Sequence, residues 1–151
     1  MNEQFVALLP QIGTWLGIVN QLHSSRMTQL LGKHNFTIVQ FALLNHLARQ
    51  QDTPQTITDL TNALEVNQPG VTKIVQKLAR LDLIVIEKDP KDSRKRLISI
   101  SQRGRETLRA VMLELAPDYV ACFAEWELDR LTEFLAQLQK LGTWLDNNRL
   151  A

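Results

Sequence analysis

The spacing of apolar residues changes once along this chain, and the change limits the folds that it can adopt. Residues 58–82 carry apolar side chains three and four positions apart, the spacing of amphipathic helices. Leu83–Glu87 and Arg96–Ser101 are instead short, β-branched runs typical of strands. The turn cluster Asp89-Pro90-Lys91-Asp92 separates them. We therefore predict two short helices followed directly by a β-hairpin.

The two predicted helices lie close enough in sequence to form a helix-turn-helix motif. The first begins at Thr58, whose hydroxyl is suited to cap a helix, and continues to Leu64. The second begins at Asn67-Gln68-Pro69, with proline in the first turn, where its missing N–H costs nothing, and continues to Asp82. In such motifs the second helix is the one that enters a DNA groove. A hairpin placed directly after it is a wing.

Longer helical patterns precede this motif. One helix is predicted over Glu3–Leu31, bent or started at Pro10 and ended by Gly32. A second helix is predicted over Ile38–Arg49. It begins at a capping box, because Thr37 and the glutamine three residues later can each satisfy a free backbone N–H group of the other.

Two more helices are predicted after the hairpin. One starts at Ser101 as N-cap and continues to Phe123, with Pro117 as an interior kink or break. The last covers Leu128–Leu145 and carries leucine and aromatic residues on one stripe. The predicted fold class is mainly α: a winged helix-turn-helix with a two-stranded β-wing and long terminal helices.

The terminal helices carry more large apolar side chains than one small domain can cover, which favours a twofold dimer. We therefore expect a single domain over residues 1–151. Within it, residues 1–34 and 106–151 would be dimerisation helices, and residues 35–105 would form the DNA-binding winged helix.

Composition limits the compartment and the class of protein. The chain has 151 residues, 44% hydrophobic and 22% charged, which is ordinary for a soluble globular protein. Its single cysteine, Cys122, excludes an intrachain disulfide, as expected in a reducing cytosol. Polar residues interrupt every apolar stretch, so we expect no membrane span, and no cation precedes the first apolar residues as in a signal peptide. A cytoplasmic protein is expected.

The net charge of +1 conceals an uneven distribution of charge. Residues 71–105 contain ten Lys or Arg and four acids, a net charge of +6, whereas the rest of the chain is at −5. A basic middle between acidic ends favours a polyanionic partner for the helix-turn-helix and the wing. Double-stranded DNA is the expected partner.

The wing and its place in the chain resemble the MarR (multiple antibiotic resistance regulator) family of winged-helix transcription factors. That family's wing motif, Asp-x-Arg followed after five residues by Leu-Thr, is matched by Asp92-Ser93-Arg94 and the following Lys95 to Ser101, with conservative changes in the last two positions. The resemblance implies a homodimer that binds a pseudopalindromic operator, usually as a repressor, and that a small ligand releases.

The resemblance also implies roles for the wing residues. Arg94 would enter the minor groove while Asp92 orients its guanidinium, because a planar cation suits a narrow, negative groove. The neighbouring cations that would contact phosphates are Lys91, Lys95 and Arg96. On the second helix of the motif, the side chains expected to meet base edges are Gln68, Thr72, Lys73 and Gln76, since Gln pairs with adenine and Lys donates to guanine.

The chain departs from the family pattern at four positions. Pro69 and Gly70 stand where relatives commonly have hydroxyl residues, which removes two donors. Asp82 stands where the helix usually ends in glycine, and Ser93 replaces a frequent arginine. These changes favour readout by the wing and by DNA shape over base contacts in the major groove.

Other functions find little support in the sequence. No phosphate-binding loop, nucleophile elbow or catalytic triad order is present, so no enzyme, catalytic residue or cofactor is expected. The three histidines, His23, His34 and His46, lack the spacing of a helical ligand pair, so no metal site is expected either. Cys122 is expected to be a half-buried helix residue, because neighbouring acids disfavour a reactive thiolate.

Two alternatives stay open at this stage. An apolar or aromatic effector pocket and plain core packing are both compatible with the side chains of Trp15, Met27, Phe36, Phe41 and Met112. The alternative to a DNA-binding regulator is a winged-helix protein-interaction module, dimeric through the same helices, whose basic wing meets an acidic protein.

Overall fold

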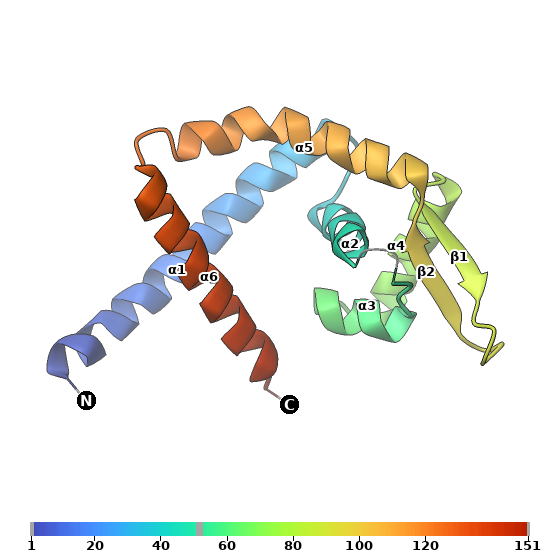
Figure 1. Ribbon diagram of the computed structural model, residues 1–151, viewed down its shortest axis with the longest axis horizontal. Helices are drawn as coiled ribbons and strands as arrows, with labels where there is room; N and C mark the ends of the chain where they lie inside the picture. Colours follow the sequence, from blue (N-terminus) through green and yellow to red (C-terminus); the bar gives the residue numbers. More distant parts are fainter. Residues whose placement is uncertain (1, 51–52, 151) are drawn as a thin grey trace. The chain divides into compact units, whose positions relative to one another are not determined.

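The computed structural model describes residues 2–50 and 53–150, which fold into helices and one β-hairpin (Figure 1). The elements are α1 (Glu3–Gly32), α2 (Ile38–Arg49), α3 (Ile57–Leu64), α4 (Gln68–Arg80), β1 (Ile84–Lys88), β2 (Arg96–Ile100), α5 (Gln102–Cys122) and α6 (Leu128–Asn147). This order confirms the mainly helical winged-helix fold. The chain divides after Met112 into two compact units. The assignment of particular segments to dimerisation and to DNA binding remains a prediction.

Helix α1 starts at Glu3, where the side chain of Asn2 accepts a hydrogen bond from the Gln4 N–H at 2.9 Å. The helix continues through Pro10, so the alternative in which it starts at this residue was wrong. It ends at Gly32 as expected, but the residue that takes a left-handed conformation is Asn35, at φ 59°. Asparagine tolerates this region better than most residues do.

The expectation that no segment is apolar enough to span a membrane was wrong for α1. Among the described residues this helix meets the length and composition of a membrane span, with a mean hydropathy of 1.3 over its best 18 residues, none of them buried. From Phe5 to Leu22 the polar residues of α1 are uncharged and spread over several turns, so they interrupt the apolar run without lowering its mean hydropathy enough. A single helix of this kind near an N-terminus is weak support for a membrane span.

Capping boxes start both α2 and α3. For α2, the Thr37 hydroxyl accepts from the Gln40 N–H and the Gln40 side chain accepts from the Thr37 N–H, as predicted. For α3, the N-cap is Thr56 and not Thr58. The Asp59 carboxylate accepts from the Thr56 N–H at 2.8 Å and from the Thr56 hydroxyl at 2.7 Å. Thr56 and not Thr58 is the N-cap because the residue three positions after Thr56 is an acid, whose carboxylate completes the reciprocal pair of hydrogen bonds.

Asn67 caps α4 as predicted, with its side chain accepting from the Gly70 N–H at 2.8 Å. The helix ends at Arg80, two residues before the predicted end. Asp82 then adopts a left-handed φ of 58°, which turns the chain into β1. The position usually given to glycine is thus occupied by a residue that tolerates this conformation at some cost.

The wing is an antiparallel pair in which Ile84 faces Ile100 and Lys88 faces Arg96. The structure adds an isolated β-bridge beside β2 that the sequence did not predict. Gln55 and Ile98 exchange backbone hydrogen bonds at 2.8 Å in both directions, on the segment between α2 and α3. One residue pair has no alternating hydrophobic pattern, so no sequence signal was available. The bridge ties the base of the wing to the start of the helix-turn-helix.

One hydrophobic core holds these elements together. It is formed by buried residues of α2, α3, α4, both strands and the start of α5: Leu43, Leu44, Leu47, Leu60, Val71, Val75, Leu78, Leu83, Ile84, Ile98, Ile100 and Leu108. The helix-turn-helix and the wing therefore share a single packed interior, which fixes their mutual position.

The start of α5 is locked against the end of α4. The Ser101 hydroxyl donates to the Asp82 carbonyl at 2.6 Å and accepts from the Gly104 N–H at 2.9 Å, which confirms Ser101 as the N-cap. Gly104 is required here, because a Cβ at this position would lie 2.0 Å from the carbonyl oxygen of Leu83. This close approach explains why a glycine, which has no Cβ, occupies this buried position in the helix.

The C-terminal unit behaves differently from the winged helix. Helix α5 continues through Pro117 without a break. Helix α6 has no buried residue, although leucine and aromatic side chains line it. Cys122 ends α5 and is exposed rather than half-buried, because the segment around it has few covering neighbours.

Candidate nucleic-acid interface

Helix α4 separates its side chains into two faces. The core-facing residues are Val71, Val75 and Leu78. Three of the four side chains predicted to meet base edges are exposed: Gln68, Lys73 and Gln76. The fourth, Thr72, is half-buried, and its hydroxyl donates to the Gln68 carbonyl at 2.9 Å. Its hydroxyl proton is therefore occupied, and only the oxygen lone pairs are left for another group.

Two further cations of α4 are exposed but were not among the predicted site residues, namely Lys77 and Arg80. Lys77 follows Lys73 by four residues, and Arg80 follows Gln76 by four, so both continue the exposed face. The Arg80 Nε donates to the Gln76 carbonyl at 3.3 Å, which holds the side chain along the helix. The same helical spacing in the sequence was the signal that would have found them.

The wing turn is shaped by its own backbone and by two aspartates. The Asp89 carboxylate accepts from the Lys91 N–H at 2.8 Å, and the Lys95 N–H donates to the Asp92 carbonyl at 2.9 Å. The Asp89 N–H donates to the Lys95 carbonyl at 3.1 Å and closes the turn. The predicted wing cations thus stand on a hydrogen-bonded loop.

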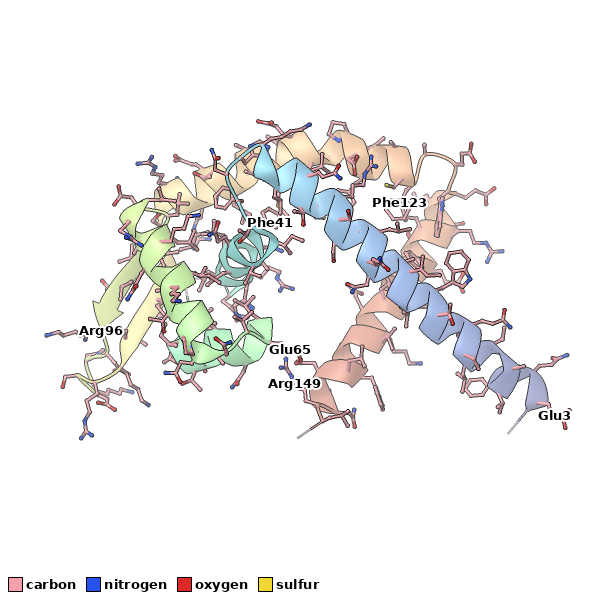
Figure 2. All side chains as sticks on the ribbon, turned by 180° about the vertical axis from the view of Figure 1, so that it is seen from behind. Glu3, Phe41, Glu65, Arg96, Phe123 and Arg149 are labelled. Atoms are coloured by element: carbon pink, nitrogen blue, oxygen red, sulfur yellow. The ribbon has the colours of Figure 1, made fainter. Side chains whose placement is uncertain are left out.

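Asp92 contacts the main chain of Arg94 and not its guanidinium. Its carboxylate accepts from the Arg94 N–H at 3.1 Å, and among residues 2–50 and 53–150 no ion pair joins the two side chains. Asp92 therefore fixes the backbone from which Arg94 projects, while the guanidinium stays exposed. Arg96 is also attached to the turn, because its Nη1 donates to the Ser93 carbonyl at 3.3 Å. Figure 2 shows Arg96 on the wing and Glu65 at the turn between α3 and α4.

A hollow of about 210 Å³ lies where the wing, the start of α3 and the start of α4 meet. It is lined by Thr56, Ile57, Thr58, Gln68, Arg94, Lys95 and Arg96. The fold thus brings together four of the predicted site residues, one from α4 and three from the wing. The other predicted residues, Thr72, Lys73, Gln76, Lys91 and Asp92, do not line this hollow. We call it the wing hollow.

Sequence reasoning missed the two threonines of the wing hollow. The Thr56 hydroxyl is engaged by Asp59, and this contact lowers the pKa of the Asp59 carboxyl below its usual 3.8 through hydrogen bonds from the Thr56 N–H and hydroxyl. The positive charge of Lys95 lowers the pKa of Asp59 further. The capping box Thr56-x-x-Asp59 was the available signal, since it would have placed α3 and its first turn correctly.

None of the histidines considered for sensing lines the wing hollow. His23 is exposed, and His34 and His46 are half-buried. Over the described ranges, no three His, Cys, Asp or Glu side chains gather as a metal site would require. Phe36 and Phe41 pack against the core, which agrees with the plain-core alternative for these two, whereas Trp15 is 64% exposed.

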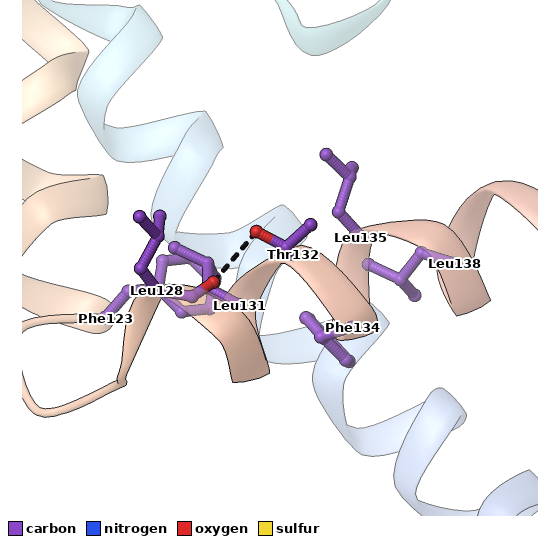
Figure 3. A pocket seen from close by; sticks show the side chains of 7 residues that line it. All are labelled: Phe123, Leu128, Leu131, Thr132, Phe134, Leu135 and Leu138. Carbon is purple, nitrogen blue, oxygen red and sulfur yellow. Dashed lines mark hydrogen bonds between the residues drawn. The ribbon is translucent and has the colours of Figure 1, made fainter.

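A second hollow, of about 400 Å³, lies in the C-terminal unit and is almost wholly apolar (Figure 3). It is lined by Phe123, Leu128, Leu131, Thr132, Phe134, Leu135 and Leu138. The Thr132 hydroxyl is turned back to the Leu128 carbonyl at 2.8 Å, so it offers no free proton to a ligand. The ring of Trp126 contacts those of Phe123 and Phe134, with centroids 5.4 and 5.2 Å away.

Comparison with known proteins agrees with this geometry. The sequence model of the MarR family matches residues 34–95, from the turn before α2 to the wing. An HTH-type transcriptional regulator of Staphylococcus aureus strain Mu50, SAV2265, is 27% identical over 86 residues, which cover 57% of this chain and 58% of that protein. The match thus spans little more than half of that relative's length. The family and this relative are transcription regulators and not enzymes.

Solved structures match over most of the chain. Wild-type apo MarR from Escherichia coli superposes with a TM-score of 0.73 at 18% identity, covering 85% of this chain and 94% of that one. Bordetella bronchiseptica BpsR, whose DNA binding is regulated by 6-hydroxynicotinic acid, gives a TM-score of 0.70 at 22% identity, with 87% and 98% covered. At these identities the likeness concerns the fold. The sequence model of the MarR family, a family of transcription regulators, thus matches the winged helix of this chain, and the solved MarR structure shares its fold.

Proposed function

We propose that this chain regulates transcription by binding duplex DNA as a homodimer on a pseudopalindromic operator. The observation that supports it best is the wing hollow, which joins Gln68 at the start of α4 to Arg94, Lys95 and Arg96 on the wing. The two elements that read DNA in winged helices thereby form one continuous surface. The three wing cations supply positive charge where a phosphate backbone would pass.

In this proposal α4 enters the major groove. Gln68, Lys73 and Gln76 are exposed and can meet base edges, and Thr72 can accept a hydrogen bond but not donate its proton while it holds the Gln68 carbonyl. Lys77 and Arg80 continue the same face toward the phosphates. Direct readout rests on few side chains, because Pro69 and Gly70 offer no polar group.

The wing enters the adjoining minor groove through Arg94. Asp92 acts by holding the backbone of Arg94, which leaves the guanidinium free to follow a narrow and negative groove. Lys91, Lys95 and Arg96 contact phosphates in this proposal. Sequence preference then depends on minor-groove width as well as on bases.

Dimerisation is assigned to the terminal helices. Helix α6 buries none of its residues within the chain, and α1 exposes a long apolar face that includes Phe5, Ile12 and Trp15. Apolar surface of this extent calls for a partner, and a second copy is the simplest one. A twofold dimer would place two α4 helices about 34–36 Å apart, one turn of DNA.

The remaining parts of the proposal concern regulation and place. We propose repression as the mode of action, release by a small apolar or aromatic effector, and a cytoplasmic location. The effector proposal is supported by what is known of BpsR, whose DNA binding responds to 6-hydroxynicotinic acid.

Selection of bound fragments from random duplex DNA tests the proposed function. A palindromic consensus with half-sites one helical turn apart is expected. Arg94→Ala should weaken binding to that consensus by about tenfold or more without changing thermal stability, because Arg94 is exposed and bonded only through its backbone. Failure of the wild-type chain to retain any duplex at low salt would favour the protein-interaction alternative.

A further inference from the structure

The wing hollow has a lining that is unusual for a structural crevice, because it is strongly cationic. Three of its seven lining residues are Arg94, Lys95 and Arg96, and none of the seven is an acid. All three cations are exposed. Like charges gathered around one hollow repel each other, so the arrangement is most favourable when an anion occupies it.

The nearby carboxylate does not neutralise the wing hollow. Asp59 is committed to Thr56, from which it accepts two hydrogen bonds of 2.8 and 2.7 Å. Lys95 lies close enough to influence Asp59 electrostatically, yet no direct ion pair joins them in the described part of the chain. The charge of Lys95 therefore remains available to another group.

Thr58 supplies a neutral donor to the same hollow. Its side chain is exposed, and within the described residues its hydroxyl makes no hydrogen bond. The hydroxyl of the other lining threonine, Thr56, donates its hydrogen bond to the Asp59 carboxylate. A hydroxyl donor beside two or three cations is a suitable set for phosphoryl oxygens, which accept several charge-assisted hydrogen bonds at once.

The position of the hollow indicates which anion it takes. A protein that places one element in the major groove and another in the adjoining minor groove must straddle the sugar-phosphate backbone that separates the two grooves. Gln68 of α4 and Arg94 of the wing both line this one hollow. Its volume of about 210 Å³ exceeds by far the roughly 30 Å³ of liquid volume of a water molecule.

We propose that the wing hollow seats one backbone phosphate of the DNA, held by Thr58 and Lys95, and that this phosphate sets the register between α4 and the wing. The inference rests on the proposed function and adds a contact that the sequence did not predict, the Thr58 hydroxyl. Arg96 has less freedom to contribute, because its Nη1 is bonded to the Ser93 carbonyl. Thr58 and Lys95 are positioning residues that act on the phosphate and not on base edges.

Replacing single phosphates by uncharged methylphosphonates tests this inference. The probe is a duplex obtained by selection with the wild-type chain, carrying one methylphosphonate per half-site at each position in turn. We expect one position at which the methylphosphonate lowers the affinity of the wild type about tenfold. At that same position the double variant Thr58→Val/Lys95→Gln should bind modified and unmodified duplex with affinities equal within about twofold. The double variant should also lower the slope of log affinity against log salt by about 0.9 for each protomer of the dimer.

Matched variants distinguish the loss of this phosphate contact from the loss of one positive charge elsewhere on the wing. Lys91→Gln removes the same charge from the wing but not from the hollow, so it should keep the sensitivity at the seat position while lowering the salt slope. Thr58→Ser retains the hydroxyl and should bind like the wild type. Thermal unfolding of all variants checks that each one is folded.

Two results would overturn the inference, and they can be told apart. If wild type binds duplex DNA but every sensitive phosphate stays sensitive in the double variant, the seat is wrong and the proposed function stands. If wild type binds no duplex, both fail.

Discussion

Helices α4 and α6 carry similar apolar stripes and use them in opposite ways. Leu78 of α4 is fully buried in the core shared with α2, α3 and the wing, whereas Leu135 of α6 is 54% exposed. The difference teaches that the winged helix completes its hydrophobic core within one chain. The stripe of α6 is not covered within the described residues, so it is the part of the molecule for which we propose a partner.

The largest expected effect comes from the core of the winged helix. Leu78→Ala removes a fully buried side chain and leaves a cavity, so we expect the free energy of unfolding to fall by about 2–5 kcal/mol. Chemical denaturation at several protein concentrations measures it. The loss should be the same at every concentration, and a loss that vanishes on dilution would mean that α4 is stabilised by a partner, as we propose for α6.

A smaller effect is expected where α5 meets the end of α4. Gly104→Ala places a Cβ against the backbone carbonyl of Leu83, which cannot move without shifting the start of β1, so a loss of about 1–3 kcal/mol is expected. Gly142→Ala in α6 is the matched control, because nothing lies within 4 Å of the place that its Cβ would occupy. The control should gain up to about 1 kcal/mol from helix propensity.

The apolar stripe of α6 should affect association and not folding. Leu135→Ala is expected to raise the dissociation constant of the dimer by about tenfold, while Gln137→Ala on the same helix leaves it unchanged. Sedimentation equilibrium measures both. Unchanged association in the leucine variant would remove this part of α6 from the interface.

The smallest effect concerns the capping box of α3. Because the folded pKa of Asp59 is lowered, its carboxylate stabilises the fold above pH 3.8, and this contribution is lost as the pH falls through the folded pKa. Asp59→Asn should cost about 0.3–1 kcal/mol at neutral pH and make unfolding less steeply dependent on acid. Asp129→Asn, in the first turn of α6, controls for the loss of one charge. Identical acid unfolding curves for wild type and Asp59→Asn would contradict this role.

Much of the fold could be predicted because its signals are local. The capping box at Thr37, the cap at Asn67 and the strand-like runs around the wing each depend on a few neighbouring residues, and each was confirmed. The cap of α3 was misplaced by two residues because several hydroxyl residues compete there, and only the pairing of Thr56 with Asp59 decides among them. The bridge between Gln55 and Ile98 could not be predicted, since it joins segments far apart in the chain.

In the candidate site, too, the sequence indicated the features that depend on neighbouring residues and missed those that depend on long-range contacts. The basic segment and the wing motif indicated Arg94, Lys95 and Arg96 from the sequence, because charge and spacing are visible there. The contact of Asp92 with a backbone N–H, and the presence of Thr58 beside these cations, depend on how the hairpin folds over the start of α3. No residue spacing records that proximity.

The sequence by itself determined which segments are helices and strands, where the positive charge lies and which stripes are apolar, because these follow from residue type and period. Only the tertiary structure decided which apolar stripes are covered and which polar groups meet in the wing hollow. The physical reason is that burial and long-range proximity depend on how the elements pack, and packing joins residues that the chain keeps apart.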